Sequence, residues 1–294
     1  MEIVKGSIAI MGSGETSPAL VSVHRKFVEM LDNQVNAFLI DTPFGFQENA
    51  DVLVDKLQLF FKKSVQIEIK LASLRNTNNI DSVEYFEMLE QLKSSNFIFS
   101  GPGSPSYASK TWLHSEIPNV LTNHLKDGKH AVFSSAAAST LGEKTIPVYE
   151  IYKVGMTPFW EEGLNTLELY GLSCTVVPHF NNKEGGNHDT SCSYIGKNRL
   201  NMLIDEEYTN ILGIDEHTAL VINGEKEIFS VDGIGSVTVK TSNGQTVFEA
   251  GNEYSLSELQ SILQATNKKE LQPKKTSSDI RSAAALIIVS CISS

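Results

Sequence analysis

The chain has 294 residues, of which 41% are hydrophobic and 20% are charged, so it can bury a substantial core. Its formal net charge of -11 argues against broad nucleic-acid binding, which needs clustered lysine and arginine. The three cysteines, Cys174, Cys192 and Cys291, are widely spaced and form neither a disulfide framework nor paired zinc motifs. No apolar stretch is long enough to span a bilayer. We therefore expect a cytoplasmic protein without nucleic-acid or membrane partners.

Short apolar runs alternate with longer amphipathic segments through the first two thirds of the chain. This pattern is typical of β-α units wound around a mostly parallel sheet. Helices are expected at residues 50–63 and 83–93, because apolar side chains recur there on one helical face. Each of these helices is the crossover that a parallel pair of strands requires. Strands are expected at residues 6–11, 36–40, 66–71, 97–100, 130–134 and 174–178.

After residue 208 the rhythm changes to short runs separated by turn residues, such as Asn223-Gly224 and Asn243-Gly244. These runs predict antiparallel strands at the edge of the same sheet, followed by a helix at 255–265. The expected fold class is a three-layer α/β/α protein with a mostly parallel central sheet and antiparallel C-terminal edge strands. We expect a single domain over residues 1–268 and a flexible C-terminal tail over 269–294.

The stretch AVFSSAAAST, residues 131–140, runs from strand formers directly into small residues. A nucleophile elbow has this character, because small neighbours allow a tight turn and the following helix directs amides at a developing oxyanion. Ser135 would occupy the tip of such a turn. The usual flanking glycines are replaced by Phe133 and Ala137. The alternative is that Ser134 or Ser135 only caps a helix that packs against the sheet.

A nucleophilic serine needs a base, and His179 follows the expected strand at 174–178. The carboxyl ends of parallel strands meet at one edge of a sheet, so His179 and Ser135 are expected on the same rim. His188 and His217 are the closest rivals among the other histidines. A structural, hydrogen-bonded role for His179 is the alternative.

Five motifs in order along residues 6–250 resemble those of peptidase family S51, which includes dipeptidase E and cyanophycinase. That family belongs to the class I glutamine amidotransferase-like fold. The motifs are IMGSGE at 10–15, IFSGPGSPS at 98–106, the SSAAA turn, PHF at 178–180 and GIDEHTAL at 213–220.

The resemblance implies a serine hydrolase with Ser135 as the nucleophile and His179 as the general base. It places the acid after the nucleophile helix, where Glu150 matches best, 15 residues beyond Ser135 (150 − 135). Glu216, in GIDEHTAL, is the rival or supporting acid. Either carboxylate is alternatively an ordinary structural group.

An oxyanion hole is expected from backbone amides. One is assigned to Ala136, directly after the nucleophile, and one to Gly103, since Pro102 has no donor. The alternatives for the GPGSPS segment are a simple turn and a phosphate-binding loop. The phosphate-binding alternative lacks the Walker lysine and the full G-x-G-x-x-G spacing.

The chain departs from the family in the segment after PHF, where peptidase members have basic residues that hold an acidic substrate group. The hydrogen-bonding residues Asn181 and Asn182 stand there instead. We assign them to substrate binding, with Lys183, Lys197 or Arg199 as compensating cations. His188 and Asp189 are expected in a polar loop that helps to place the substrate.

The same segment contains metal-ligand types, but their spacing matches no strong signature, so no metal or cofactor is expected. Aromatic residues at 149–160 belong to the core or, alternatively, form a substrate wall or a homodimer contact. The predicted function is hydrolysis of a peptide or amide bond in a small substrate through an acyl-Ser135 intermediate. The alternatives are a non-catalytic, metabolite-binding amidotransferase-like domain and an interaction protein that uses the acidic surface and the tail.

Overall fold

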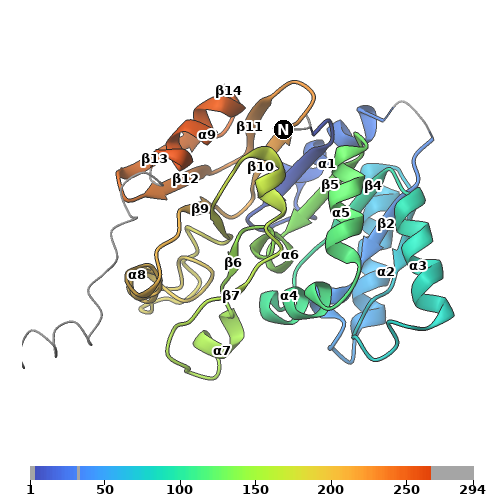
Figure 1. The fold of residues 1–294 in the computed structure, drawn as a ribbon, viewed down its shortest axis with the longest axis horizontal. Coiled ribbons are helices and arrows are strands. Elements are labelled where there is room, and N and C mark those ends of the chain that lie inside the picture. Colours follow the sequence, from blue (N-terminus) through green and yellow to red (C-terminus); the bar gives the residue numbers. More distant parts are fainter. Residues whose placement is uncertain (1–3, 32–33, 266–294) are drawn as a thin grey trace, which may run out of the picture.

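The computed structural model describes residues 4–31 and 34–265. The predicted tail at 269–294 and the domain boundary at 268 lie outside these residues. Within them, the chain forms an eight-stranded sheet, a separate four-stranded sheet and a small two-stranded sheet of β6 (Lys144–Thr145) and β7 (Glu161–Glu162). Figure 1 shows the larger sheet flanked by helices on both faces. The predicted three-layer α/β/α fold is confirmed.

Five neighbouring strands of the larger sheet run parallel, as the alternating sequence pattern predicts. In spatial order they are β1 (Ser7–Met11), β5 (His130–Ser134), β4 (Phe97–Ser100), β2 (Ala37–Ile40) and β3 (Ile69–Ala72). Antiparallel strands continue the sheet from β1 outward, and they are β10 (Thr218–Asn223), β11 (Ile228–Gly233) and β14 (Glu253–Ser255).

The smaller sheet is the main departure from the sequence prediction, which placed all these strands in one sheet. Its order is β13 (Gly244–Glu249), β12 (Ser236–Thr241), β9 (Ile211–Ile214) and β8 (Thr175–Val177), with β8 and β9 parallel. After β9 the chain crosses between the two sheets in three short links, at 215–217, 234–235 and 250–252. The backbone turns sharply at each link, because φ is 53° at His217, 114° at Gly233 just before the second link, and 88° at Gly251.

The helices cover the sheets as amphipathic layers. One face of the larger sheet packs on α1 (Pro18–Glu29) and α2 (Ala50–Phe60), and the other packs on α3, α4, α5 and α9. A third cluster joins α7 and α8 to the smaller sheet. The remaining bounds are α3 (Val83–Ser94), α4 (Pro105–Leu113), α5 (Ile117–Lys126), α6 (Ala136–Ser139), α7 (Val148–Tyr152), α8 (Lys197–Glu206) and α9 (Leu256–Gln264).

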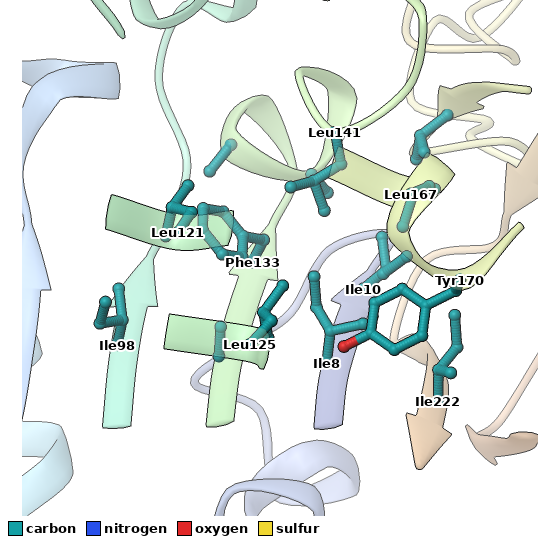
Figure 2. Packing of buried hydrophobic residues seen from close by; sticks show 14 of the residues in the cluster. Ile8, Ile10, Ile98, Leu121, Leu125, Phe133, Leu141, Leu167, Tyr170 and Ile222 are labelled. Atoms are coloured by element: carbon teal, nitrogen blue, oxygen red, sulfur yellow. The ribbon is translucent and has the colours of Figure 1, made fainter. Parts of the chain in front are cut away.

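Strand β1 shows why the larger sheet is buried on both sides. Ile8 and Ile10 point to one helical layer, Ala9 and Met11 point to the other, and all four are fully buried. Figure 2 shows the first layer, where Ile8 lies between Leu125 and Tyr170. Full burial of each large apolar side chain stabilises the fold by about 1.5–3 kcal/mol. The core therefore fixes β1 and its neighbours as a rigid platform.

Local signals explain several element boundaries. Ser82 accepts a hydrogen bond from Tyr85 N at 3.2 Å and caps α3. The predicted helix at 50–63 is α2 followed by a π-helical turn, Phe61–Val65, which ends at Gln66 with a φ of 69°. This left-handed residue delays the next strand, so β3 begins at 69 rather than 66. Among residues 4–31 and 34–265, no helix is both long and apolar enough to cross a membrane.

Candidate active site

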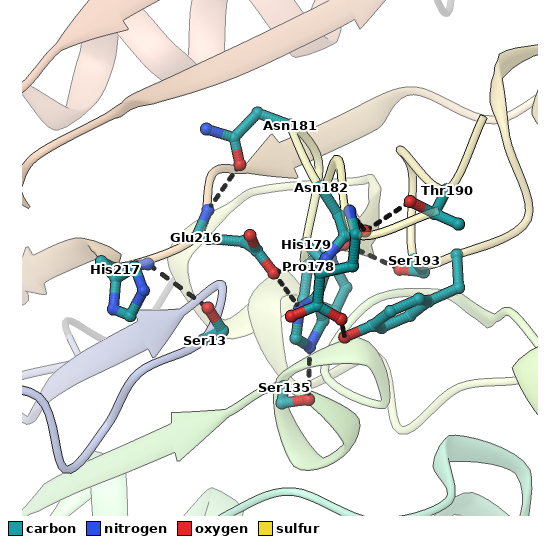
Figure 3. Close-up of polar contacts among 12 residues, drawn as sticks. Ser13, Ser135, Pro178, His179, Asn181, Asn182, Thr190, Ser193, Glu216 and His217 are labelled. Atoms are coloured by element: carbon teal, nitrogen blue, oxygen red, sulfur yellow. Dashed lines mark hydrogen bonds and ion pairs between the residues drawn. The ribbon is translucent and has the colours of Figure 1, made fainter. Parts of the chain in front are cut away.

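The carboxyl ends of four strands meet where the two sheets adjoin. Ser135 N, directly after β5, donates to Met11 O of β1 at 3.0 Å. His179 N, just after β8, donates to Gly12 O at 3.3 Å. Glu216 lies in the link that leaves β9. Ser135 and His179 therefore lie at one rim and contact each other, as predicted, although they come from different sheets (Figure 3).

Ser135 forms a strained turn between β5 and α6, with φ 51° and ψ −114°. Such a backbone costs roughly 1–3 kcal/mol and tends to occur at functional sites. The residues that replace the usual flanking glycines, Phe133 and Ala137, do not obstruct the turn. Phe133 points into the core, with its ring 6.2 Å from that of Trp112, and Ala137 N donates to Gly101 O at 3.2 Å. Ser135 therefore adopts the elbow geometry with Phe133 and Ala137 at the flanks.

Three side chains form a hydrogen-bonded row (Figure 3). Ser135 Oγ lies 2.8 Å from His179 Nε2, and His179 Nδ1 lies 2.9 Å from Glu216 Oε1. The hydrogen bond with His179 is the main reason that the pKa of Glu216 is lowered, and a hydrogen bond from Asn182 acts in the same direction. An ionised carboxylate therefore orients the imidazole whose other nitrogen meets the serine hydroxyl.

Glu150, the acid preferred from the sequence, does not reach the imidazole. It lies on α7, and its Oε1 accepts a hydrogen bond from Ser106 Oγ of α4 at 2.7 Å. The sequence argument relied on its distance along the chain from Ser135, but α7 forms the opposite wall of the site. The carboxylate beside His179 belongs to the rival, Glu216.

Asn181 and Asn182 support Glu216 and are not among the residues that line the cavity. Asn182 Nδ2 donates to Glu216 Oε1 at 2.8 Å, while Glu216 N donates to Asn181 Oδ1 at 2.9 Å. Asn182 is almost fully buried, and its Oδ1 accepts from Thr190 Oγ1 at 2.6 Å. These amides therefore contact Glu216 instead of facing the cavity, where the sequence analysis expected them.

The other three residues expected to contact a substrate also lie outside the cavity lining. Asp189 accepts hydrogen bonds from Ser191 and from Lys197 N, which lower its pKa to about 2. Arg199 Nη1 donates to Ile195 O at 3.5 Å. His188 stacks on Tyr152, with ring centroids 6.0 Å apart. Asp189 and Arg199 therefore bind their own loop and helix, while His188 supports a tyrosine of the cavity wall.

A cavity of about 460 Å³ opens over Ser135 and His179. Gly103 and Ala136, the two residues assigned to an oxyanion hole, both line it. Within the described part of the chain, neither of their amides donates a hydrogen bond to a protein acceptor. Gly103 has a φ of 149°, and a Cβ there would lie 1.9 Å from Pro43 O. The chain approaches so closely at this point that only glycine fits.

The walls of the cavity include residues that the sequence analysis singled out and residues that it missed. Tyr149 and Tyr152 come from the aromatic segment that the sequence singled out, and Lys153 follows them. Glu184 and Tyr194 come from the segment after His179. No motif identifies them, because their placement depends on how α7 and the 184–194 segment fold toward Ser135.

Lys153 and Glu184 give the cavity one cation and one anion. Neither side chain has an ion-pair partner among the described residues. The Lys153 ammonium lies 4.7 Å from the centroid of the Tyr152 ring. The cavity therefore presents two opposite charges that remain available to a charged ligand.

No group of three or more histidine, cysteine or acidic residues gathers as a metal-ligand set in residues 4–31 and 34–265. Cys192 is buried, which raises the pKa of its thiol. The metal-ligand types noted after His179 in the sequence therefore do not converge.

In the Ser-His-Glu row an imidazole lies between a hydroxyl and a carboxylate, as in a serine triad. The model of peptidase family S51 matches residues 8–229, about three quarters of the chain. The chain therefore belongs to peptidase family S51, a family of peptidases. This confirms the resemblance carried by the five motifs.

Two solved structures share the fold. A peptidase from an acI-B1 Actinobacterium is 22% identical, with a TM-score of 0.70, over 86% of this chain and 98% of that one. A candidate peptidase E from Listeria monocytogenes EGD-e is 16% identical, with a TM-score of 0.52, over 78% of this chain and 99% of that one. No curated protein sequence matches this chain.

Proposed function

We propose that this protein is a serine-type peptidase that cleaves a peptide or amide bond in a small substrate through an acyl-Ser135 intermediate. One observation carries the proposal: the strained Ser135 turn presents its Oγ 2.8 Å from His179 Nε2, while Glu216 lies 2.9 Å from the other ring nitrogen. A nucleophile, a base and an orienting acid are thus in contact, as this chemistry requires.

In the proposed reaction His179 Nε2 takes the Ser135 proton as Oγ attacks the carbonyl carbon of the substrate. The same nitrogen then gives that proton to the leaving amine, and the carbon-nitrogen bond breaks to leave an acyl ester on Ser135. Water, deprotonated by His179, hydrolyses the ester. Glu216 holds the imidazole in the required orientation and stabilises its charged form.

The negative charge that develops on the substrate oxygen would be bound by Ala136 N and Gly103 N. Both amides line the cavity with Ser135, and neither has another acceptor in the described residues. Each such donor typically contributes about 10²- to 10³-fold to kcat. The departures at Phe133 and Ala137 leave this arrangement in place.

The size of the cavity suits a short substrate. Its volume of about 460 Å³ is within the usual range for small-ligand sites. Lys153 and Glu184 are exposed at the cavity wall, and their opposite charges suit a substrate with an anionic and a cationic group. We therefore propose short, charged peptides as the substrate class.

The test is covalent labelling by a fluorophosphonate probe, followed by hydrolysis assays with a panel of short peptides. Wild-type protein should react with the probe, and Ser135→Ala should not. Ser134→Ala is the matched control, because Ser134 is the neighbouring serine but its Oγ donates to Glu15 Oε2 at 2.8 Å.

The control variant should be labelled like wild type. Folded wild-type protein that resists the probe, or Ser135→Ala protein that reacts with it, would overturn the proposed mechanism. Labelling without hydrolysis of any peptide would instead restrict the substrate class and point to another amide.

A further inference from the structure

Three consecutive residues beside the site have left-handed backbones. Cys192, Ser193 and Tyr194 have φ values of 53°, 57° and 67°. Residues other than glycine visit this region mostly one at a time, at a cost of roughly 1–2 kcal/mol each. A run of three persists only where the surrounding structure holds it. Such strain commonly marks a functional element.

The turn is fastened to the short segment that carries His179. Ser193 Oγ donates to Pro178 O at 2.8 Å, and Cys192 N donates to Phe180 O at 3.2 Å. These bonds bracket His179 on both sides along the chain. The turn and the histidine therefore form one locally rigid unit.

The turn places Tyr194 against the imidazole. The centroids of the Tyr194 and His179 rings are 5.0 Å apart, and the ring planes are inclined by 50°. The Tyr194 hydroxyl donates to Glu184 Oε2 at 3.5 Å. On its other flank Tyr194 meets Tyr152 of α7, with centroids 6.0 Å apart. Tyr194 is thus supported at its tip and at one side.

The two hydrogen bonds of His179 leave one motion of the ring unrestrained. Hydrogen bonds at imidazole nitrogens favour the ring plane, so the bonds at Nε2 and Nδ1 set the direction of the ring but resist rocking about the line that joins the two nitrogens only weakly. A packed ring against the imidazole restricts that rocking and excludes water from the hydrogen bond to Glu216. Burial also raises the pKa of Tyr194 to about 12, so its hydroxyl stays protonated beside Glu184.

We propose that Tyr194 is a positioning residue, held by the left-handed turn, whose ring fixes the His179 imidazole for proton transfer with Ser135. This inference rests on the proposed function. It goes further by assigning a specific task to a residue that makes no hydrogen bond to any member of the Ser-His-Glu row. Misplacement of a catalytic group by about 1 Å can cost about 10²-fold in rate.

The test compares Tyr194→Ala with Tyr194→Phe. We expect Tyr194→Ala to lower kcat and the second-order rate of fluorophosphonate labelling about tenfold or more, with KM changed less than about threefold. Tyr194→Phe keeps the ring and should stay within about twofold of wild type. Phe86→Leu, which removes an exposed aromatic ring on α3, is the control and should leave both rates unchanged. Thermal unfolding checks each variant, and Tyr194→Leu replaces the alanine variant if that one fails to fold.

Wild-type rates in Tyr194→Ala, or a change confined to KM, would overturn the positioning role while leaving the serine mechanism intact. A phenylalanine variant as impaired as the alanine variant would also overturn it, because the hydroxyl would then be the active part. Wild-type protein that is not labelled at all would overturn the proposed function itself. The two failures are therefore distinguishable.

Discussion

The two sheets contribute different parts of the site. The eight-stranded sheet supplies the serine, on a turn that follows β5 and is hydrogen-bonded to the end of β1. The four-stranded sheet supplies the imidazole after β8 and the carboxylate after β9. Within each sheet the backbone ladder fixes the local geometry. The distance that matters most, from Ser135 Oγ to His179 Nε2, spans the junction between them. The chemistry therefore depends on how firmly the two sheets are joined.

The largest effect is expected from removing the acid of the smaller sheet. Glu216→Gln keeps the shape of the side chain but removes the charge that stabilises a protonated His179. We expect kcat/KM for peptide hydrolysis to fall about 10³-fold or more, as for charge removal in other serine triads. Glu150→Gln is the matched variant, since glutamine still accepts a hydrogen bond from Ser106, and it should lose less than about tenfold.

Labelling rates with the fluorophosphonate probe should follow the same order. If Glu150→Gln is impaired as severely as Glu216→Gln, the acid has been assigned to the wrong carboxylate. The smaller sheet would then supply only the imidazole, and the proposed division of the site between the two sheets would be wrong.

The next effect tests the junction itself. Gly12 lies where β1 meets the smaller sheet: its N donates to Thr218 O at 2.9 Å and its O accepts from His179 N. A Cβ at Gly12 would lie 2.1 Å from Asp215 O, next to Glu216. Gly12→Ala should therefore shift the smaller sheet relative to Ser135 and lower kcat/KM about 10²-fold, by misplacement of the base.

Gly6→Ala separates this effect from simple destabilisation. Gly6 lies at the other end of β1, and a Cβ there would lie 2.4 Å from Leu125 O, so the crowding is comparable. Both variants should unfold at lower temperature, but Gly6→Ala should keep wild-type kcat/KM below its melting range. Equal loss of activity in the two variants would show that stability, not the junction, controls the rate.

The sequence predicted the positions that follow from a local pattern. Ser135 comes directly after β5 and His179 two residues after β8, so the position of each strand almost fixes the position of the side chain. The parallel direction of the first five strands was also predicted from a local pattern, the alternation of short apolar runs with amphipathic segments. Neither prediction needed to know that His179 belongs to another sheet, because β8 still ends at the same rim.

The same local reasoning could not decide which glutamate contacts His179, nor which residues contact that glutamate. Glu216 and Glu150 both follow recognisable segments, and only the packing of α7 against α4 takes Glu150 away from the imidazole. Asn182 was expected to bind substrate because it stands where related peptidases have basic residues, yet here it is buried and donates to Glu216. Tyr194 had no signal at all, since its contact with His179 depends on a left-handed turn that the residue types do not encode.

The smallest expected effect concerns the response of the two sheets to acid. His24 on α1 and His124 on α5 are buried on opposite faces of the larger sheet. Burial lowers the pKa of His24 from 6.5 to about 4, and that of His124 from 6.5 to about 3. Glu216 at the smaller sheet has a lowered pKa as well, but its unfolded value is 4.5. Its contribution to stability is therefore complete above pH 4.5 and is lost only below that.

Between pH 6.5 and 4.5 the two histidines should dominate this contrast. In that window the two histidines bind protons in the unfolded chain but stay neutral in the folded chain, so the free energy of unfolding falls as the pH is lowered. The loss should approach about 1.4 kcal/mol per pH unit for each histidine. Urea unfolding across this window measures the slope, which should decrease in His24→Gln and in His124→Gln. The exposed His114 provides the control, because His114→Gln should leave the slope unchanged. If neither His24→Gln nor His124→Gln changes the slope, other groups cause the loss of stability at low pH. The larger sheet would then not be the part of the fold that acid destabilises first.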